Sequence, residues 1–315
     1  MSNLIDSISS PVIIISVFRS GSNIVKGIIC NIPGYCTWPA ENINFIWRHG
    51  NVLAADDELG PSDVNDSVRK YIYKEFNKIL TKHGCKNVVE KSEANALRIG
   101  YVNKIFPNAK YVFVMRDGRD AIASMLKRRR WTLSFHTLSF LLKKARYVPL
   151  SDIPIVTIRY FSNLFYRFFF MKKKVYKLGP VFKGMNDLLC NHTEEEVVAL
   201  QWSVCIGKAY DDITKIDSDR VYFLKYENLV NNVDIEVTNL IKFIDEGLTD
   251  SGITSILNNI NDYNIGRETS SNDIKNVKGI SNKSVGKWKT QLDDKTLDVI
   301  MPIIQPTMQK IGYLE

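Results

Sequence analysis

The chain has 315 residues, of which 45% are apolar and 11% aromatic. This length and composition are typical of a folded globular chain and exclude an intrinsically disordered one. The net charge of +8 predicts an anionic ligand or surface, although a basic surface kept for solubility explains it equally well.

The positive charge is concentrated in one segment. Residues 126–183 hold fourteen Lys or Arg and a single acidic residue, Asp152, so they carry +13 and the rest of the chain −5. Residues 131–190 also contain several prolines and an aromatic cluster, which breaks the pattern of the flanking regions. We therefore expect a basic, aromatic and largely helical insertion over 131–190.

Apolar β-branched runs alternate with amphipathic stretches along the rest of the chain. The runs at 12–17 and 111–115 are typical of strands buried on both faces of a parallel sheet. Further strands are expected at 88–90 and 221–226, and helices at 24–31, 66–83, 94–106, 119–128, 193–216, 233–245 and 292–311. Residues 259–286, rich in Asn, Ser and Gly, are expected to form a long loop. The alternation of strands and helices predicts a wound, parallel α/β sheet.

The cysteines and the start of the chain bear on location. The five cysteines form no Cys-x-x-Cys pair, and the four histidines are scattered, so no metal site is predicted. Reduced thiols are expected, which suits a cytoplasmic protein. The first residues lack the basic region of a signal peptide, and the apolar run at 11–17 is too short to span a bilayer.

A candidate phosphate-binding loop, Arg19-Ser-Gly-Ser-Asn23, follows the first strand. At a helix start, backbone N–H groups and the helix dipole attract an anion. Gly21 would let the backbone approach closely, and Ser20 and Ser22 could donate hydrogen bonds. Arg19 could hold a phosphate through two hydrogen bonds. The pattern favours a phosphate site over an ordinary strand-to-helix turn.

The same loop argues against a magnesium-dependent kinase or ATPase. Such a protein needs Gly-x-x-x-x-Gly-Lys-Ser/Thr, with the lysine over the phosphates. Here Lys26 lies within the expected helix, and no expected strand ends in a clear magnesium-binding aspartate.

Four blocks of the sequence resemble, in the same order, those of sulfotransferases that use 3′-phosphoadenosine 5′-phosphosulfate (PAPS). Phe18–Asn23 is similar to their 5′-phosphosulfate loop, and Arg116-Asp-Gly-Arg-Asp-Ala-Ile-Ala-Ser124 to their 3′-phosphate motif. Glu90-Lys-Ser-Glu93 resembles the stretch before that strand, and Ser284-Val-Gly-Lys-Trp-Lys289 a glycine/tryptophan loop over the cofactor. The most similar branch contains tyrosylprotein and bacterial carbohydrate sulfotransferases.

The resemblance implies a single domain over 1–315 with a P-loop-NTPase-like parallel sheet flanked by helices. Residues 259–291 would then cover the cofactor. Residues 19–23 would hold the 5′-phosphosulfate, and Arg116 and Ser124 the 3′-phosphate. The full set of cofactor-binding residues that it implies is Arg19, Ser20, Gly21, Ser22, Asn23, Arg116, Ser124, Tyr226, Ser284, Lys287 and Trp288.

Sulfuryl transfer needs a base for the acceptor hydroxyl and positive charge where the S–O bond breaks. By the resemblance, Glu41 is the base, while Arg19 and Lys91 stabilise the transferring group without a metal. The alternatives are that Glu41 is a solvated loop carboxylate and Lys91 a surface lysine. His83 is a lesser candidate for the base.

Departures from the family's patterns bear on the acceptor. Gly286 stands where tyrosylprotein relatives carry a catalytic serine, for which Ser284 is a candidate substitute. Glu93 replaces a proline, and Asn95 stands where many carbohydrate relatives have histidine. We expect transfer to a carbohydrate hydroxyl of a polysaccharide, glycolipid or lipid-linked sugar, with release of 3′-phosphoadenosine 5′-phosphate (PAP). The alternatives are a kinase-like phosphotransferase and a non-catalytic, basic membrane-binding protein.

The basic insertion suggests a peripheral membrane contact. Residues 161–174 combine aromatic side chains with Lys172, Lys173 and Lys174, which would suit an anionic bilayer surface. Contact there would favour a lipid-linked sugar at the cytoplasmic face. An acidic polysaccharide, or a core helix whose lysines extend to solvent, is the alternative. No nucleic acid is expected, because no recognised binding module accompanies the charge.

Overall fold

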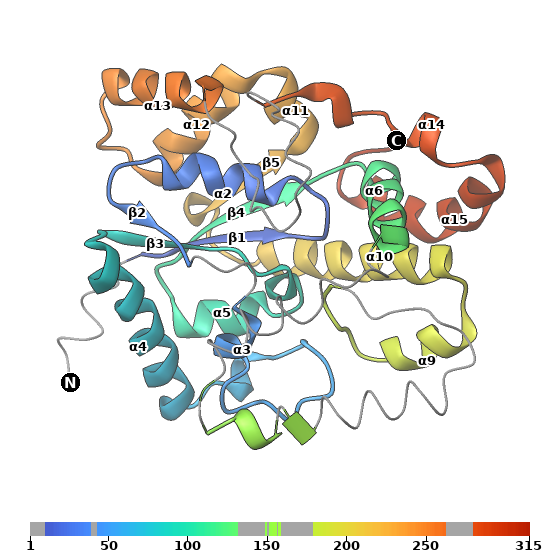
Figure 1. The fold of residues 1–315 in the computed structure, drawn as a ribbon, viewed down its shortest axis with the longest axis horizontal. Coiled ribbons are helices and arrows are strands. Elements are labelled where there is room, and N and C mark those ends of the chain that lie inside the picture. The colour runs from blue at the N-terminus through green and yellow to red at the C-terminus, as the bar shows by residue number, and fades with distance from the viewer. Residues whose placement is uncertain are drawn as a thin grey trace.

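The computed structural model describes residues 10–38, 43–131, 149, 151–155, 157–158, 179–262 and 280–315. Its centre is a parallel five-stranded sheet in the order β2-β3-β1-β4-β5 (Figure 1). The strands are β1 (Val12–Ser16), β2 (Tyr35–Cys36), β3 (Asn87–Glu90), β4 (Lys110–Met115) and β5 (Val221–Lys225). The predicted wound, parallel α/β sheet is confirmed, and only the two-residue β2 was not expected.

The α-helices are α2 (Ser22–Cys30), α3 (Asn44–Trp47), α4 (Asp66–His83), α5 (Ile99–Ile105), α6 (Gly118–Trp131), α9 (Met185–Asn191), α10 (Glu194–Ile213), α11 (Tyr226–Asn231), α12 (Val233–Ile244), α13 (Asp250–Asp262), α14 (Trp288–Gln291) and α15 (Asp294–Lys310). Short 3₁₀ helices are η1 (Pro61–Asp63), η2 (Glu93–Leu97), η3 (Ser218–Arg220) and η4 (Asn282–Ser284).

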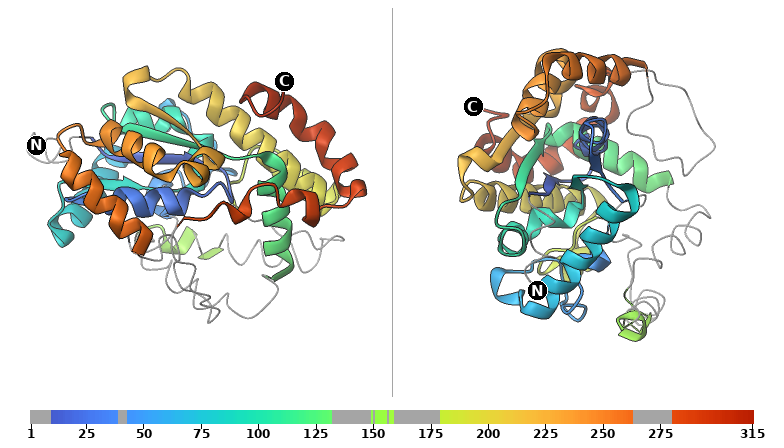
Figure 2. Two further views of the ribbon diagram at one scale, coloured as in Figure 1. Left: turned by 90° about the horizontal axis from the view of Figure 1, so that it is seen from above. Right: turned by 90° about the vertical axis from the view of Figure 1, so that its left-hand side faces the viewer.

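Helices cover both faces of the sheet. Successive side chains of a strand point to opposite faces, so β1 contributes Val12 and Ile14 to one core and Ile13 and Ile15 to the other. The first core lies under α2, α11, α12 and α13, above the sheet in Figure 1. The second lies over α3, α4, α5 and α10. Helix α15 packs along α10, where Ser203 Oγ lies 2.6 Å from Thr307 Oγ1 (Figure 2).

Local end signals explain several helix boundaries. Helix α4 ends at Gly84, whose φ of 62° is the left-handed conformation that glycine adopts readily. Helix α10 begins at the Thr193 cap, whose side chain accepts from Glu196 N–H while the Glu196 carboxylate accepts from Thr193 N–H.

Three expected boundaries were wrong. The helix expected at 94–106 is split at Arg98 into η2 and α5. Residues 259–262, expected in a loop, belong to α13, which extends to Asp262, and residues 263–279 lie outside the described residues. Helix α11 follows β5 directly, and no helix was expected there. In α13, the burial of Ile253, Ile256 and Ile260 decides the structure over the asparagine-rich composition.

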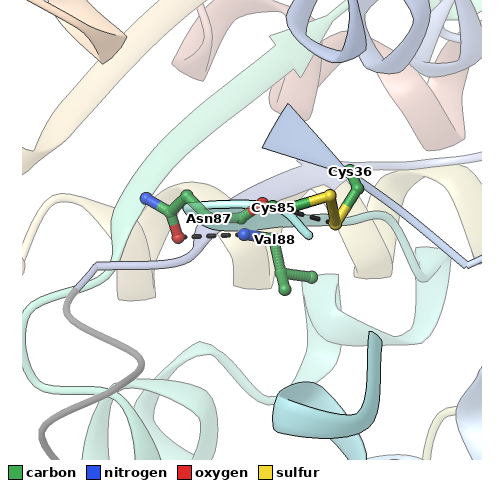
Figure 3. Close-up of a disulfide and its surroundings, with 4 residues drawn as sticks. All are labelled: Cys36, Cys85, Asn87 and Val88. Carbon is green, nitrogen blue, oxygen red and sulfur yellow. Dashed lines mark hydrogen bonds between the residues drawn. A yellow bond between two sulfur atoms is a disulfide. The ribbon is translucent and has the colours of Figure 1, made fainter. Parts of the chain in front are cut away.

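A disulfide joins Cys36 to Cys85 across the edge of the sheet (Figure 3). Strand β2 pairs with β3 through Cys36 and Val88, which brings the two cysteines to a Cα–Cα distance of 6.0 Å. The expectation of reduced thiols was therefore wrong for this pair, whereas Cys30, Cys190 and Cys205 are free. The cytoplasmic location stays a prediction, and the bond counts against it because disulfides are more typical of oxidising compartments.

Most of the expected insertion lies outside the described residues, including all of 161–174, so its membrane contact stays a prediction. Its final part, from 179, leads into α9. Within the described ranges, no helix combines the length and apolar character needed to cross a bilayer.

Candidate functional site

The loop between β1 and α2 has the backbone geometry of an anion site. Arg19 has a φ of 61° and Gly21 a φ of 85°, and left-handed residues in such loops can turn backbone N–H groups toward one point. Helix α2 starts at Ser22 with Gly21 as its cap, and no described side chain caps it. Its positive dipole end is therefore presented at the carboxyl edge of the sheet.

Two side chains of this loop make different contacts, one within the loop and one with α6. Ser20 is buried, and its hydroxyl donates to the Val17 carbonyl at 2.9 Å. Because a serine hydroxyl has one hydrogen to donate, this hydroxyl holds the turn together. Arg19 is exposed, and its Nε donates to Ser124 Oγ at 2.9 Å.

Two features favour glycine at position 21: its left-handed backbone conformation and the closeness of an aromatic ring. A Cβ at this position would lie 2.4 Å from Cδ2 of Tyr226. Tyr226 opens α11 directly after β5 and is 4% exposed. The centre of its ring also lies 4.6 Å from the Arg116 guanidinium carbon. Tyr226 therefore contacts both phosphate motifs.

Arg116 connects three segments of the predicted site. It follows β4 and is buried, with Nη1 donating to the Arg19 carbonyl at 2.8 Å and Nη2 to the Ser284 carbonyl at 2.6 Å. Its Nε is buried and has no hydrogen-bond partner among the described residues. The structure thus brings Arg19, Gly21, Arg116, Ser124, Tyr226 and Ser284 together.

The segment after η4 lies against the start of α6. Arg119 pairs with Asp117 at 2.6 Å, and its guanidinium carbon lies 4.3 Å from the centre of the Trp288 ring. Lys287 is exposed beside it. Figure 1 shows α6 and α14 close together at one end of the sheet.

Lys91 belongs to a buried turn. Strand β3 pairs with β1 through Glu90 and Ile13, so Lys91 and the Arg19 loop leave neighbouring strands at the same edge of the sheet. The Lys91 side chain is 9% exposed, and its Nζ lies 3.6 Å from Glu93 Oε1. The side chain is thus largely buried beside Glu93, and because no described contact joins Lys91 to the loop, its catalytic role stays a prediction.

A chain of buried polar groups closes the turn around Lys91. Asn95 Nδ2 donates to Glu90 Oε2 at 2.6 Å, and Arg98 Nε donates to Asn95 Oδ1 at 2.8 Å. Burial raises the pKa of Glu90 and lowers that of Arg98, against the attraction between the two charges. Asn95 is fully buried between these partners, so it supports the turn.

Of the two candidates for the base, the structure describes only His83. Glu41 lies outside the described residues, so its role stays a prediction. His83 is exposed in the last turn of α4. Among the described residues, no group of three or more His, Cys, Asp or Glu is placed to hold a metal ion.

Comparison with known proteins gives the family. Residues 9–312 match the family model described as the sulfotransferase domain. The chain belongs to the sulfotransferase family.

Solved sulfotransferases share the fold. The STF9 sulfotransferase of Mycobacterium avium aligns with a TM-score of 0.51 and 11% identity over 100% of this chain and 80% of that one. The sulfotransferase domain of the curacin biosynthetic pathway aligns with a TM-score of 0.53 and 12% identity over 98% and 99%. The expected P-loop-NTPase-like α/β fold of sulfotransferases is confirmed.

A curated relative supports the expected branch. Protein-tyrosine sulfotransferase 1 of Danio rerio is 34% identical over 96 residues, which cover 30% of this chain and 26% of that protein. The chain spans less than half the length of the curated relatives that it matches.

Sequence reasoning missed several residues of the site. Asp120 and Arg119 contact the segment after η4, yet both lie inside the quoted 3′-phosphate motif. Their position on the first turn of α6, beside Arg116, was a signal that could have identified them. Glu227 carried no comparable signal: one carboxylate oxygen accepts from Asp117 N–H and the other from the Tyr313 hydroxyl.

Proposed function

We propose that the protein transfers a sulfuryl group from PAPS to an acceptor hydroxyl and releases PAP. The observation that carries the proposal is the junction of the two phosphate motifs. Arg116 donates to the Arg19 carbonyl and Arg19 donates to Ser124, so the loop after β1 and the start of α6 form one cationic site. ATP enzymes need no second phosphate motif of this kind.

The residues present fit a donor with two separate phosphate groups. The start of α2 offers backbone N–H groups to one anionic end. At the other end, Ser124 Oγ accepts from Arg19 Nε, Arg116 donates to the Arg19 carbonyl, and Arg116 Nε is a buried donor without a partner among the described residues. An anion bound there would satisfy this atom, whose burial without a hydrogen bond is costly.

PAPS would supply an activated sulfuryl group, with PAP as its leaving group. The protein's part is to hold the two ends of the donor, exclude water and place charge at the reacting oxygens. Residues 19–23 would hold the 5′ end, and Arg19 and Lys91 would stabilise charge there. Glu41 would accept the proton of the acceptor hydroxyl. Tyr226, Lys287 and Trp288 would enclose the donor.

We assign a carbohydrate hydroxyl as the acceptor. Its support is the glycine at 286, where tyrosylprotein relatives have a catalytic serine. The match to Danio rerio protein-tyrosine sulfotransferase 1 favours a second candidate, the tyrosine hydroxyl of a protein. Contact of residues 161–174 with a membrane would favour a lipid-linked sugar over either.

Transfer from radiolabelled PAPS to a panel of acceptors tests the proposal. The panel contains polysaccharides, glycolipids, lipid-linked sugars and tyrosine peptides, and Arg19→Ala is the inactive control. We expect label in a carbohydrate. Label in the peptide alone would overturn the acceptor, and label transferred equally by Arg19→Ala would overturn the site.

A further inference from the structure

Asp120 fastens the segment 284–288, which we name the cover loop, to the first turn of α6. Its Oδ2 accepts from Gly286 N–H at 2.8 Å and its Oδ1 from Trp288 N–H at 2.9 Å. The Asp120 residue is 2% exposed. Both oxygens of one buried carboxylate therefore bind the backbone on either side of Lys287.

The Asp120 carboxylate and the backbone of the cover loop are suited to these two hydrogen bonds. Hydrogen bonds to an ionised acceptor are about twice as strong as neutral ones. Gly286 has a φ of 70°, which lets the two N–H groups turn toward the same carboxylate without the cost that a side chain would add. Arg116 Nη2 lies 4.0 Å from Asp120 Oδ2 and balances its charge.

The same motif holds the cover loop at two further points. Arg116 Nη2 donates to the Ser284 carbonyl, and Arg119 lies against the Trp288 ring. Asp120 is distinct from both because its side chain accepts hydrogen bonds from the cover loop and pairs with Arg116. Its effect on a ligand must pass through the residues that it holds.

We propose that Asp120 is a positioning residue that fixes the cover loop so that Lys287 reaches the bound donor. The inference rests on the proposed function, which places Lys287 in the donor site. Fixing the backbone on both sides of Lys287 lowers the conformational entropy that donor binding would otherwise have to remove. Loss of Asp120 weakens donor binding through Lys287.

A double-mutant cycle on PAP affinity tests this, with Asp120→Asn, Lys287→Met and the double variant measured by titration calorimetry. An asparagine keeps one acceptor oxygen and turns an NH₂ group toward the other N–H, so we expect PAP affinity to fall about 10-fold, one hydrogen bond to a charged group. In the Lys287→Met background, Asp120→Asn should change affinity less than about 2-fold. Equal losses in the two backgrounds would overturn the inference.

A second measurement does not depend on PAP. In Asp120→Asn, hydrogen exchange at the amides of Gly286 and Trp288 should rise in the free protein. Unchanged exchange would contradict the proposed hold on the loop. Gly286→Ala strains the same loop without touching the core, since nothing lies within 4 Å of its Cβ position; it should also weaken PAP binding, and unchanged affinity would count against the inference.

The control and the wild type separate the possible failures. Asp293 also accepts a backbone N–H, from Thr296, but it caps α15. Asp293→Asn should therefore leave PAP affinity unchanged, and a loss there would show that general destabilisation explains the data. Wild-type protein that does not bind PAP overturns the proposed function, whereas wild-type binding that Asp120→Asn leaves unchanged overturns the positioning role alone.

Discussion

Replacing Gly21 with alanine tests the loop after β1 at its tightest point. With a φ of 85°, an alanine there costs about 1–2 kcal/mol in backbone strain. The new Cβ would lie 2.4 Å from Tyr226 Cδ2 and 2.7 Å from Cε2, well inside the roughly 3.5–4 Å of an ordinary carbon contact. The ring must therefore move, and overpacking of this kind costs about 1–3 kcal/mol. We expect Gly21→Ala to lower the free energy of unfolding by about 2–5 kcal/mol.

Gly84 provides the matched control for this change. Its φ is 62°, and a Cβ there meets nothing within 4 Å, so Gly84→Ala should cost only the backbone strain of about 1–2 kcal/mol. Urea unfolding of both variants gives the difference, which isolates the contact with Tyr226. Because that ring lies against Arg116, PAP affinity should fall in Gly21→Ala and not in Gly84→Ala. Equal losses of stability, or unchanged PAP affinity in Gly21→Ala, would refute the reasoning.

Three further predictions concern the disulfide, the Lys91 turn and the base. Cys36→Ser removes a disulfide between residues 49 positions apart and should lower the free energy of unfolding by about 4 kcal/mol under oxidising conditions. In urea unfolding, a reductant should lower the free energy of unfolding of the wild type by the same amount and leave that of the variant unchanged. Asn95→Ala leaves the buried Glu90 carboxylate and Arg98 Nε without this partner and should lower the free energy of unfolding by about 2–6 kcal/mol. PAPS turnover should fall more than PAP affinity, and equal falls would contradict the link between Asn95 and Lys91. Glu41→Gln should lower transfer from labelled PAPS by about 100-fold or more, and full activity would exclude Glu41 as the base.

The sequence predicted the main elements because burial on both faces leaves a continuous apolar run. Residues 12–16 are such a strand, with alternate side chains in the two cores. Strand β2 has two residues and no such pattern, so neither it nor the Cys36–Cys85 bond beside it could be predicted. In α13, Ile253, Ile256 and Ile260 have helical spacing and are buried, but the asparagines near its end are more typical of a loop.

The same contrast holds for the site. The phosphate motifs are local in sequence, so their residues could be named in advance. Their contacts are not local: Arg19 meets Ser124 at a separation of 105 residues, and Asp120 meets Gly286 at 166. Only the fold shows that Gly21 makes room for Tyr226 or that Ser20 holds its own turn.

The binding of PAP compared with ADP tests the central claim most directly, because both carry two phosphates and only PAP places one of them at the 3′ position assigned to Arg116 and Ser124, whereas ADP carries both at the 5′ position. At a PAP concentration 100 times its dissociation constant, binding contributes about 2.7 kcal/mol, or a rise in melting temperature of about 5 °C at roughly 2 °C per kcal/mol. We predict this rise with PAP in the absence of metal, a much smaller one with ADP or with ATP and Mg²⁺, and loss of the difference in Arg116→Met. Equal shifts with PAP and ADP, or a larger shift with ATP and Mg²⁺, would contradict the account.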